Sequence, residues 1–159
     1  MNITTSYKVQ IVGINKMLRP TVNKYREALT FLIPIVNKEW DIISIASGVK
    51  RKTIVEHLIH TTKDNEAKYS EFDQLFHKMP SYFRRGVIAD AIGIVSSYRS
   101  NYENWEKNGK IGKPPRLQTK HYNCPIFYRD NTYEETDNPN VVKLKLFINQ
   151  EKNNFKSHL

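Results

Sequence analysis

Apolar side chains recur at every third or fourth position between residues 87 and 105, and this stripe constrains the fold more than any other part of the chain. Such spacing is typical of a helix that buries one face. Pro80-Ser81 suits the start of a helix and Asn108-Gly109 suits its end. We therefore predict one long helix between these dipeptides, the longest of the chain, with the following stripe in the core: Val87, Ile88, Ala91, Ile92, Val95, Tyr98, Tyr102 and Trp105.

Shorter helices are expected before this one, and strands at both ends of the chain. Apolar spacing predicts helices over residues 18–37, 40–46, 50–60 and from Thr62 or Asp64 to about Lys78, with Pro34 ending or kinking the first. Alternating and β-branched residues predict strands over 7–14 and 141–148, and a hairpin of 125–129 with 132–135 about Asp130-Asn131, followed by a turn cluster at 136–140.

This order predicts an α+β fold. The simplest arrangement is a small antiparallel β-barrel or sheet, formed by residues 1–16 and 112–159 and interrupted by a helical insertion over 17–111. With 159 residues, the chain is long enough for one such domain without disulfide or metal staples.

Positive charge is concentrated around the end of the long helix. The net charge is +9, and residues 80–129 hold nine Lys or Arg against three Asp or Glu. Residues 107–129 hold six Lys or Arg and no acid. Neighbouring cations repel one another unless a polyanion binds between them, so the pattern favours a nucleic-acid-binding surface.

Three groups of residues are candidates for nucleic-acid contact. The loop cations Lys107, Lys110, Lys113, Arg116, Lys120 and Arg129 suit a phosphate backbone, although a solvated surface turn is the alternative. Arg84, Arg85 and Arg99 extend the surface along the helix, unless they only face solvent near Asp90 and Glu103. Tyr122 and Tyr128 are candidates for base stacking, although aromatic residues in strands, here also Phe127 and Tyr133, more often pack across strands.

Catalytic and metal-binding patterns are weak in this sequence. His57 and His60 share a helical face without an HExxH motif, and no Cys or carboxylate cluster has ligand spacing, so we expect no catalytic residue, metal or cofactor. Cys124 is alone, which excludes an internal disulfide and fits a cytoplasmic protein. No apolar run approaches the roughly 20 residues that span a membrane.

A second binding mode is an alternative. Residues 45–58, IASGVKRKTIVEHL, have residue types of a helix-turn-helix, with Lys50, Arg51 and Lys52 at a helix start. The turn glycine usually follows the small alanine by four positions, whereas Gly48 follows Ala46 by two. A stand-alone DNA-binding regulator using residues 40–60 is therefore the alternative hypothesis.

Residues 80–117, PSYFRRGVIADAIGIVSSYRSNYENWEKNGKIGKPPRL, resemble the helix and basic loop in the N-terminal half of TnpB/OrfB-type transposon proteins, the compact relatives of type V CRISPR effectors. The tract YNCPIFYRDNTYE is similar to the strand pair after that loop, and residues 7–29 to the first strand and helix. The resemblance covers most of residues 7–148 and is weakest over 40–78.

The resemblance implies an RNA-guided DNA endonuclease whose N-terminal part is a wedge-like barrel interrupted by a helical recognition domain. It implies guide RNA and target DNA as partners, with sequence read mainly by base pairing. The chain ends at Leu159 without the metal-binding carboxylates of the nuclease half, so we expect no DNA cleavage by this chain alone, and a divalent metal only in a separate nuclease half. An enzyme active after assembly with such a half, and an inert remnant of a mobile element, are the further alternatives.

Overall fold

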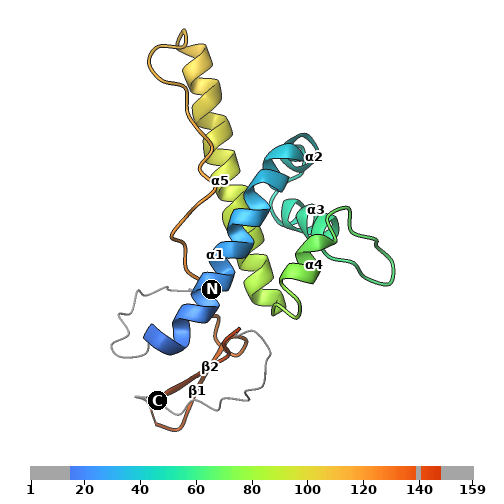
Figure 1. Cartoon of the computed structure of the whole chain (residues 1–159), viewed down its shortest axis with the longest axis vertical. Helices are drawn as coiled ribbons and strands as arrows, with labels where there is room; N and C mark the ends of the chain where they lie inside the picture. Colours follow the sequence, from blue (N-terminus) through green and yellow to red (C-terminus); the bar gives the residue numbers. More distant parts are fainter. Residues whose placement is uncertain (1–14, 139–140, 148–159) are drawn as a thin grey trace, which may run out of the picture.

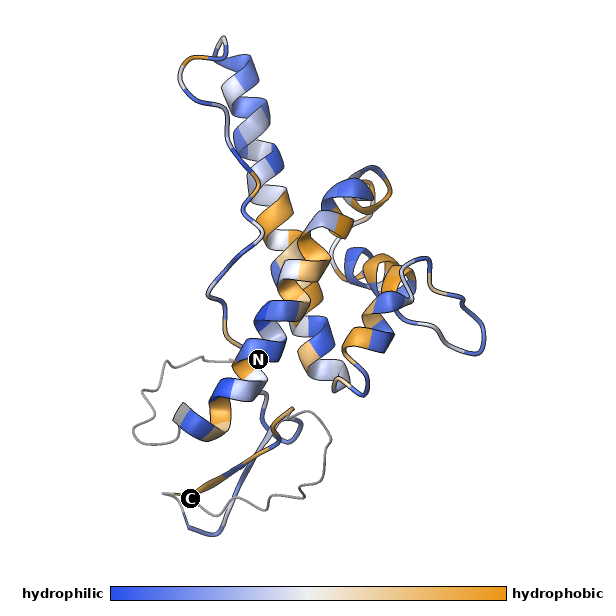
Figure 2. Cartoon of the chain, viewed as in Figure 1, coloured by the Kyte–Doolittle hydropathy of each residue, from blue (hydrophilic) through white to orange (hydrophobic). Residues whose placement is uncertain are grey.

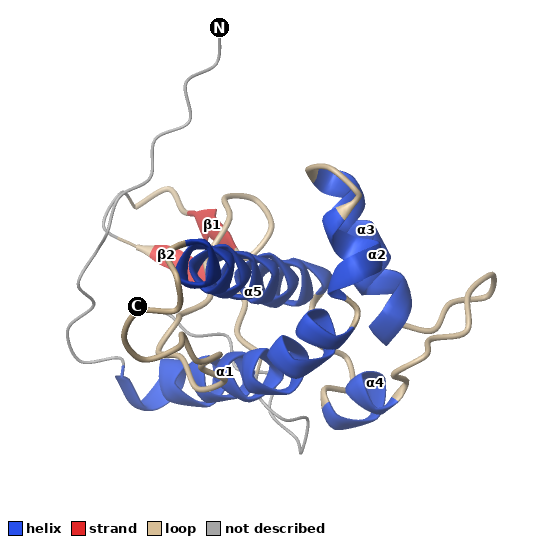
Figure 3. Ribbon diagram, turned by 90° about the horizontal axis from the view of Figure 1, so that it is seen from above, coloured by secondary structure: helices blue, strands red, loops and turns tan. Residues whose placement is uncertain are grey.

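Two long helices form the centre of the molecule in a computed structural model that describes residues 15–138 and 141–147. α1 (Asn15–Lys38) packs against α5 (Ser81–Lys107) (Figures 1 and 3). Their facing sides carry apolar residues three and four positions apart, which are the orange bands where the helices meet in Figure 2. The buried residues are Tyr25, Ala28, Leu29, Leu32, Ile33 and Val36 on α1, and Phe83, Val87, Ile88, Ala91 and Val95 on α5.

α1 continues for one turn past Pro34, so the expected end near residue 37 is confirmed. A proline inside a helix costs about 3 kcal/mol, because it removes one hydrogen bond and crowds the preceding turn. Pro34 lies on the exposed side of α1, while its neighbours Leu32, Ile33 and Val36 are fully buried. Each such buried side chain contributes about 1.5–3 kcal/mol, and together they outweigh the cost of the proline.

Three short helices cover one side of this pair. α2 (Trp40–Ser44), α3 (Val49–Ile59) and α4 (Glu71–Leu75) contribute Ile43, Val55, Ile59 and Phe72 to the core. The ring of Phe72 lies 4.9 Å from Phe76 and 6.0 Å from Phe31 of α1, between ring centroids. These contacts attach α4 to the centre of the molecule.

The helix expected from Thr62 or Asp64 to Lys78 is wrong, since only Glu71–Leu75 is helical. Residues 60–70 form a projecting loop instead. Asn65 donates to the carbonyls of His57 and His60, and Asp73 accepts from the Thr61 amide. Asn, Asp and Thr side chains that bond the backbone locally compete with the helix, which is the physical reason for the loop.

A two-stranded antiparallel sheet lies at one end of the molecule. β1 (Tyr133–Glu135) pairs with β2 (Val142–Leu144), with Glu134 opposite Lys143. Of the predicted strand over 141–148, only Val142–Leu144 is a strand, and residues 145–147 are not. Residues 136–138 of the predicted turn cluster follow β1 as a bend. Helices followed by a small antiparallel sheet confirm the α+β class. The predicted strand over 7–14 lies outside the described residues.

The predicted hairpin of 125–129 with 132–135 is wrong. Residues 128–133 form a tight loop in which the amides of Thr132 and Tyr133 both bond the Tyr128 carbonyl, at 2.8 and 3.1 Å. Asp130 has a φ of 61°, and the Thr132 hydroxyl accepts from the Tyr128 amide. These bonds occupy the groups that a strand ladder with residues 125–129 would need, so β1 pairs with β2 instead.

The sheet is attached to the helices through Phe147. Its ring is buried, and its carbonyl accepts a 2.9 Å hydrogen bond from the buried Thr21 hydroxyl of α1. None of the helices in the described part of the chain is long and apolar enough to cross a membrane.

Candidate nucleic-acid interface

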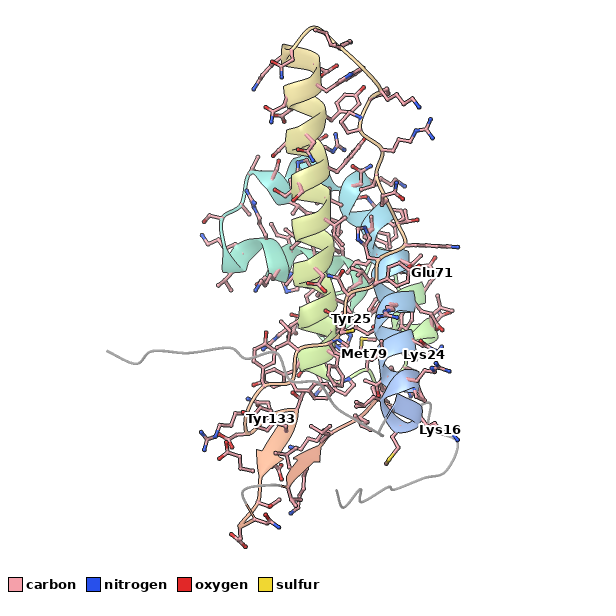
Figure 4. The ribbon with its side chains drawn as sticks, turned by 90° about the vertical axis from the view of Figure 1, so that its left-hand side faces the viewer. Lys16, Lys24, Tyr25, Glu71, Met79 and Tyr133 are labelled. Atoms are coloured by element: carbon pink, nitrogen blue, oxygen red, sulfur yellow. The ribbon has the colours of Figure 1, made fainter. Side chains whose placement is uncertain are left out.

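The last turns of α5 and the segment that follows project from the helical bundle as a finger, which we define as residues 100–120 (Figures 1 and 4). The helix ends with a reversal in which Gly109 N–H bonds the Glu106 carbonyl and Lys110 N–H bonds the Trp105 carbonyl, at 3.1 and 2.9 Å. This pair of bonds is the Schellman motif, and Gly109 adopts the positive φ of 74° that it requires. The predicted helix end at Asn108-Gly109 is therefore confirmed.

Aromatic rings in tilted contact line the base and the helical side of the finger. Tyr98 and Tyr102 lie 6.0 Å apart between ring centroids, and Tyr102 and Trp105 lie 5.5 Å apart. The Trp105 indole N–H donates to the Gly112 carbonyl at 3.4 Å. In the predicted core stripe Val87, Ile88, Ala91 and Val95 are buried and Ile92 is half-buried, and the three rings beyond Val95 are also half-buried.

The chain returns from the fingertip as an extended segment. From Pro115 to Phe127 its residues alternate strictly, with odd-numbered residues shielded and even-numbered residues exposed. Leu117 and Phe127 on the shielded side pack against the hydrophobic core. The exposed side presents a row that contains Arg116, Lys120 and Tyr122.

The finger is a positively charged projection. It carries the five exposed cations Lys107, Lys110, Lys113, Arg116 and Lys120 against Glu103 and Glu106, a net charge of +3. Lys110 lies 3.5 Å from Glu106, a surface pair that leaves the ammonium largely exposed. These five predicted site residues are brought together in one finger.

The predicted site residues on α5 lie elsewhere. Arg84 is half-buried and bonds Glu56 of α3 at 3.0 and 3.2 Å, and Arg99 bonds the side chain and carbonyl of Asn37 at 3.0 and 2.9 Å. Both guanidinium groups hold helices together. Arg85 is 60% exposed, but 22 residues of helix place it about 33 Å from Lys107.

The three remaining predicted residues lie on or after the returning segment. Tyr122 is 89% exposed, and the Arg26 guanidinium carbon lies 5.5 Å from its ring centroid. The Tyr128 ring contacts that of Tyr82 at a tilt, with 5.9 Å between centroids, and Arg129 forms a 2.7 Å ion pair with Glu135. Tyr122 therefore lies beside the finger, whereas the other two lie near β1.

A groove beside Tyr122 was not predicted from the sequence. It encloses ≈ 650 Å³ between α1, the end of α4 and the returning segment, and Phe31, Phe76 and Leu75 supply its apolar lining. Lys24, Arg26, Lys120 and His121 also line it, together with Glu27, which pairs with Lys24 at 2.6 Å. The polar residues Asn23, Lys24, Arg26 and Glu27 are visible in the sequence, but nothing in it places them beside the returning segment.

A hydrogen-bond network fixes the returning segment next to this groove. Arg26 donates to the carbonyls of Tyr122 and Asn123, each at 3.0 Å. Asp90 of α5 accepts from Asn123 at 2.9 Å and from the buried Tyr25 hydroxyl at 2.8 Å. Burial, together with the bond to Asp90, raises the pKa of Tyr25 well above its ordinary value of 10.0. The Tyr25 hydroxyl therefore stays protonated and donates to Asp90, which links α1 to α5, and Asp90 in turn binds Asn123 of the returning segment.

His57 and His60, predicted to share a helical face, lie next to the loop before α4. His60 Nδ1 lies 2.8 Å from Asp73, and both line a small cavity of ≈ 270 Å³, while His57 is exposed. Among the residues that the structure describes, no three His, Cys, Asp or Glu side chains are grouped to hold a metal ion.

The helix-turn-helix alternative has a partial structural counterpart. α2 and α3 are joined by a short turn at Gly48, whose φ is 48°. Arg51 is used within this turn, because it donates to the carbonyls of Ala46 and Ser44 at 2.7 and 2.9 Å. Lys50 and Lys52 are exposed, but α2 has only five residues.

The fold and the finger define an α+β protein with a basic projection. The chain belongs to the Aq_aa04 family, whose model matches residues 3–148. It is similar to a protein of Aquifex aeolicus (strain VF5) named "Uncharacterized protein aq_aa04", with 28% identity over 147 residues that cover 85% of this chain and 83% of that protein. No solved structure matches the chain significantly.

Proposed function

We propose that this chain binds nucleic acid, chiefly structured RNA, through the basic finger. The observation that carries the proposal is the exposure of five cations on one projection that holds only two acids. The like charges on such a projection repel one another, and together they attract a polyanion. The tilted ring contacts and the Schellman motif hold its shape, which lowers the conformational entropy lost on binding.

The resemblance to TnpB-type proteins supports a more specific form of this proposal. In that form the RNA is a guide RNA and the second partner is its target DNA, and the wedge-like barrel would close by pairing of residues 7–14 with β1 and β2. Cleavage would then need a separate nuclease half with its divalent metal. A cytoplasmic location, expected from the lone cysteine, suits an RNA ligand.

A salt titration tests the finger directly. Binding of a fluorescent RNA hairpin is measured by anisotropy at several salt concentrations for the wild type and for the triple variant Lys110→Gln, Lys113→Gln and Arg116→Gln. Each lost phosphate contact lowers the slope of log affinity against log salt by about 0.7–0.9. We expect weaker binding and a slope smaller by about 2–3, with unchanged thermal unfolding because all three side chains are exposed.

The matched control removes the same charge elsewhere, by Lys50→Gln, Lys52→Gln and Lys63→Gln, which are also exposed. This variant should keep most of the affinity. The regulator hypothesis predicts the reverse, namely loss of duplex DNA binding in this control and full binding in the finger variant. A wild-type chain that binds neither RNA nor DNA at low salt contradicts both.

A further inference from the structure

The groove beside Tyr122 combines an apolar lining, an exposed aromatic ring and cations. Phe31 and Leu75 lie on its apolar side. Tyr122 is 89% exposed, although burial of a tyrosine ring is favourable. Arg26 donates to the Tyr122 carbonyl at 3.0 Å and its guanidinium lies over one face of the ring, so the backbone of Tyr122 is held beside the groove and the other face of the ring is open. A preformed flat ring over an apolar groove suits another flat ring.

We propose that this groove is a subsite for one nucleotide of a single strand, with the base stacked on Tyr122 and the phosphate held by Lys120 and Lys24. The inference rests on the proposed function and adds to it the strand form and the place where a base is bound. The volume of ≈ 650 Å³ lies within the range of about 300–1,000 Å³ that is usual for small-molecule pockets. The bases of a double helix are already stacked and paired, whereas a base of a single strand is available to stack on a protein ring.

Charge on the groove favours an anionic ligand. Lys24, Arg26 and Lys120 line it with Glu27 as the acid, a net charge of +2. Glu27 is partly neutralised by its 2.6 Å pair with Lys24. An acidic peptide would use the cations but would leave the apolar lining and the Tyr122 ring without a partner, whereas a nucleotide uses all three.

The finger leads to this groove. Arg116, Lys120 and Tyr122 are exposed on the same side of the returning segment, where alternate residues are about 6.6 Å apart. A single strand that follows this row passes from phosphate contacts on the finger to a stacking contact in the groove. Proteins that bind single strands commonly combine a cationic path with aromatic platforms in this way.

Affinity for a fluorescent oligo(dT) strand tests the inference, measured by anisotropy for Tyr122→Ala, Tyr122→Phe and the control Ile126→Ala. We expect Tyr122→Ala to lose affinity by roughly 5- to 150-fold, the effect of losing one stacked base. Tyr122→Phe should keep it, because stacking needs the ring and not the hydroxyl. Ile126 is an exposed apolar residue of the same segment outside the groove lining, so its truncation should leave affinity unchanged.

A second readout uses Cys124, the single cysteine of the chain, whose sulfur lies 3.5 Å from Arg26. Its labelling by a thiol reagent should slow when oligo(dT) is bound to the wild type. This readout does not depend on any substitution.

The outcomes separate the inference from the proposed function. If Tyr122→Ala binds as tightly as the wild type while the finger variant still loses binding, the groove is not a nucleotide subsite, but the finger remains the binding surface. Competition by polyglutamate as strong as that by oligo(dT) also overturns the groove as a nucleotide site. A wild type that binds no nucleic acid of any form overturns the proposed function and the inference together.

Discussion

Tyr25 lies where α1, α5 and the returning segment meet, and its hydroxyl bonds Asp90 at 2.8 Å. Burial raises the pKa of this hydroxyl above 10.0, so the folded chain keeps the proton at a pH where the unfolded chain loses it. The unfolded state then binds fewer protons, and the free energy of unfolding falls as the pH rises above 10.

The variant Tyr25→Phe should therefore show a stability deficit that depends on pH. At pH 8 we expect it to be about 1–3 kcal/mol less stable than the wild type, because Asp90 loses a hydrogen bond. At pH 11 the deficit should shrink by about 1.4 kcal/mol, because phenylalanine has no proton to lose. Urea unfolding at both pH values measures this, and a deficit of the same size at each would contradict it. All other tyrosines are present in both chains, so their contributions to the pH dependence of the free energy of unfolding cancel in the difference.

Single arginines show what the sequence can and cannot predict at this scale. Arg84 and Arg85 are adjacent, yet Arg84 is enclosed by its pair with Glu56 while Arg85 is 60% exposed. Helical spacing predicts that the two point in different directions, but Glu56 lies 28 positions away on α3. Both arginines pair with Glu56, Arg84 at 3.0 Å and Arg85 at 3.9 Å. Only the packing of α3 on α5 decides which of the two is enclosed, so the sequence alone could not separate them.

Gly86 and Gly93 both lie inside α5, and they differ in what an added methyl group would meet. At Gly93 nothing lies within 4 Å of the position of a Cβ atom, so Gly93→Ala should raise the free energy of unfolding by about 0.5–1 kcal/mol. At Gly86 the Cβ would lie 3.1 Å from the Tyr25 hydroxyl oxygen, which the bond to Asp90 holds in place. Gly86→Ala should therefore be less stable than the wild type, since overpacking costs about 1–3 kcal/mol.

Thermal or urea unfolding of the two alanine variants measures this difference directly. Combining Gly86→Ala with Tyr25→Phe removes the nearest atom and should recover part of the loss. Equal stabilisation by both alanines would show that the ring moves aside freely, and that the close approach of α1 and α5 at this point is not fixed.

Elements with long periodic patterns were predicted well, and those that depend on local competition were not. The stripe from Val87 and the caps of α5 were sufficient to place that helix and its end at Asn108-Gly109. The segment after residue 60 has aromatic residues at helical spacing, but bonds from Asn65 and to Asp73 hold it as a loop. Likewise, local bonds around Thr132 replace the predicted pairing of 125–129 with 132–135, and β1 pairs with β2 instead.

At the scale of the whole molecule, charge and shape are arranged together. The finger and the loop over residues 60–70 both project from the bundle, in different directions (Figure 1). The finger has a net charge of +3, whereas the loop carries Lys63 and Lys68 against Asp64 and Glu66 and is neutral. The sequence indicated the excess charge of the finger. It did not indicate the groove, because α1 and the returning segment are about 95 residues apart and meet only in the fold.

The finger and the loop over residues 60–70 differ in charge, so the loop can serve as the internal control when protection of the finger from a protease is measured. Trypsin cuts exposed loop tips first, so both Lys110 in the finger and Lys63 in the loop should be early sites in the free chain. An RNA hairpin bound to the finger should slow cleavage after Lys107 and Lys110 several-fold and leave cleavage after Lys63 unchanged, as measured by mass spectrometry of the first fragments. Salt should remove the protection, because the contacts are with phosphates. Equal protection of both projections would mean that RNA only inhibits the protease or coats the protein, and protection of Lys63 alone would place the binding surface on the side of α3 and α4.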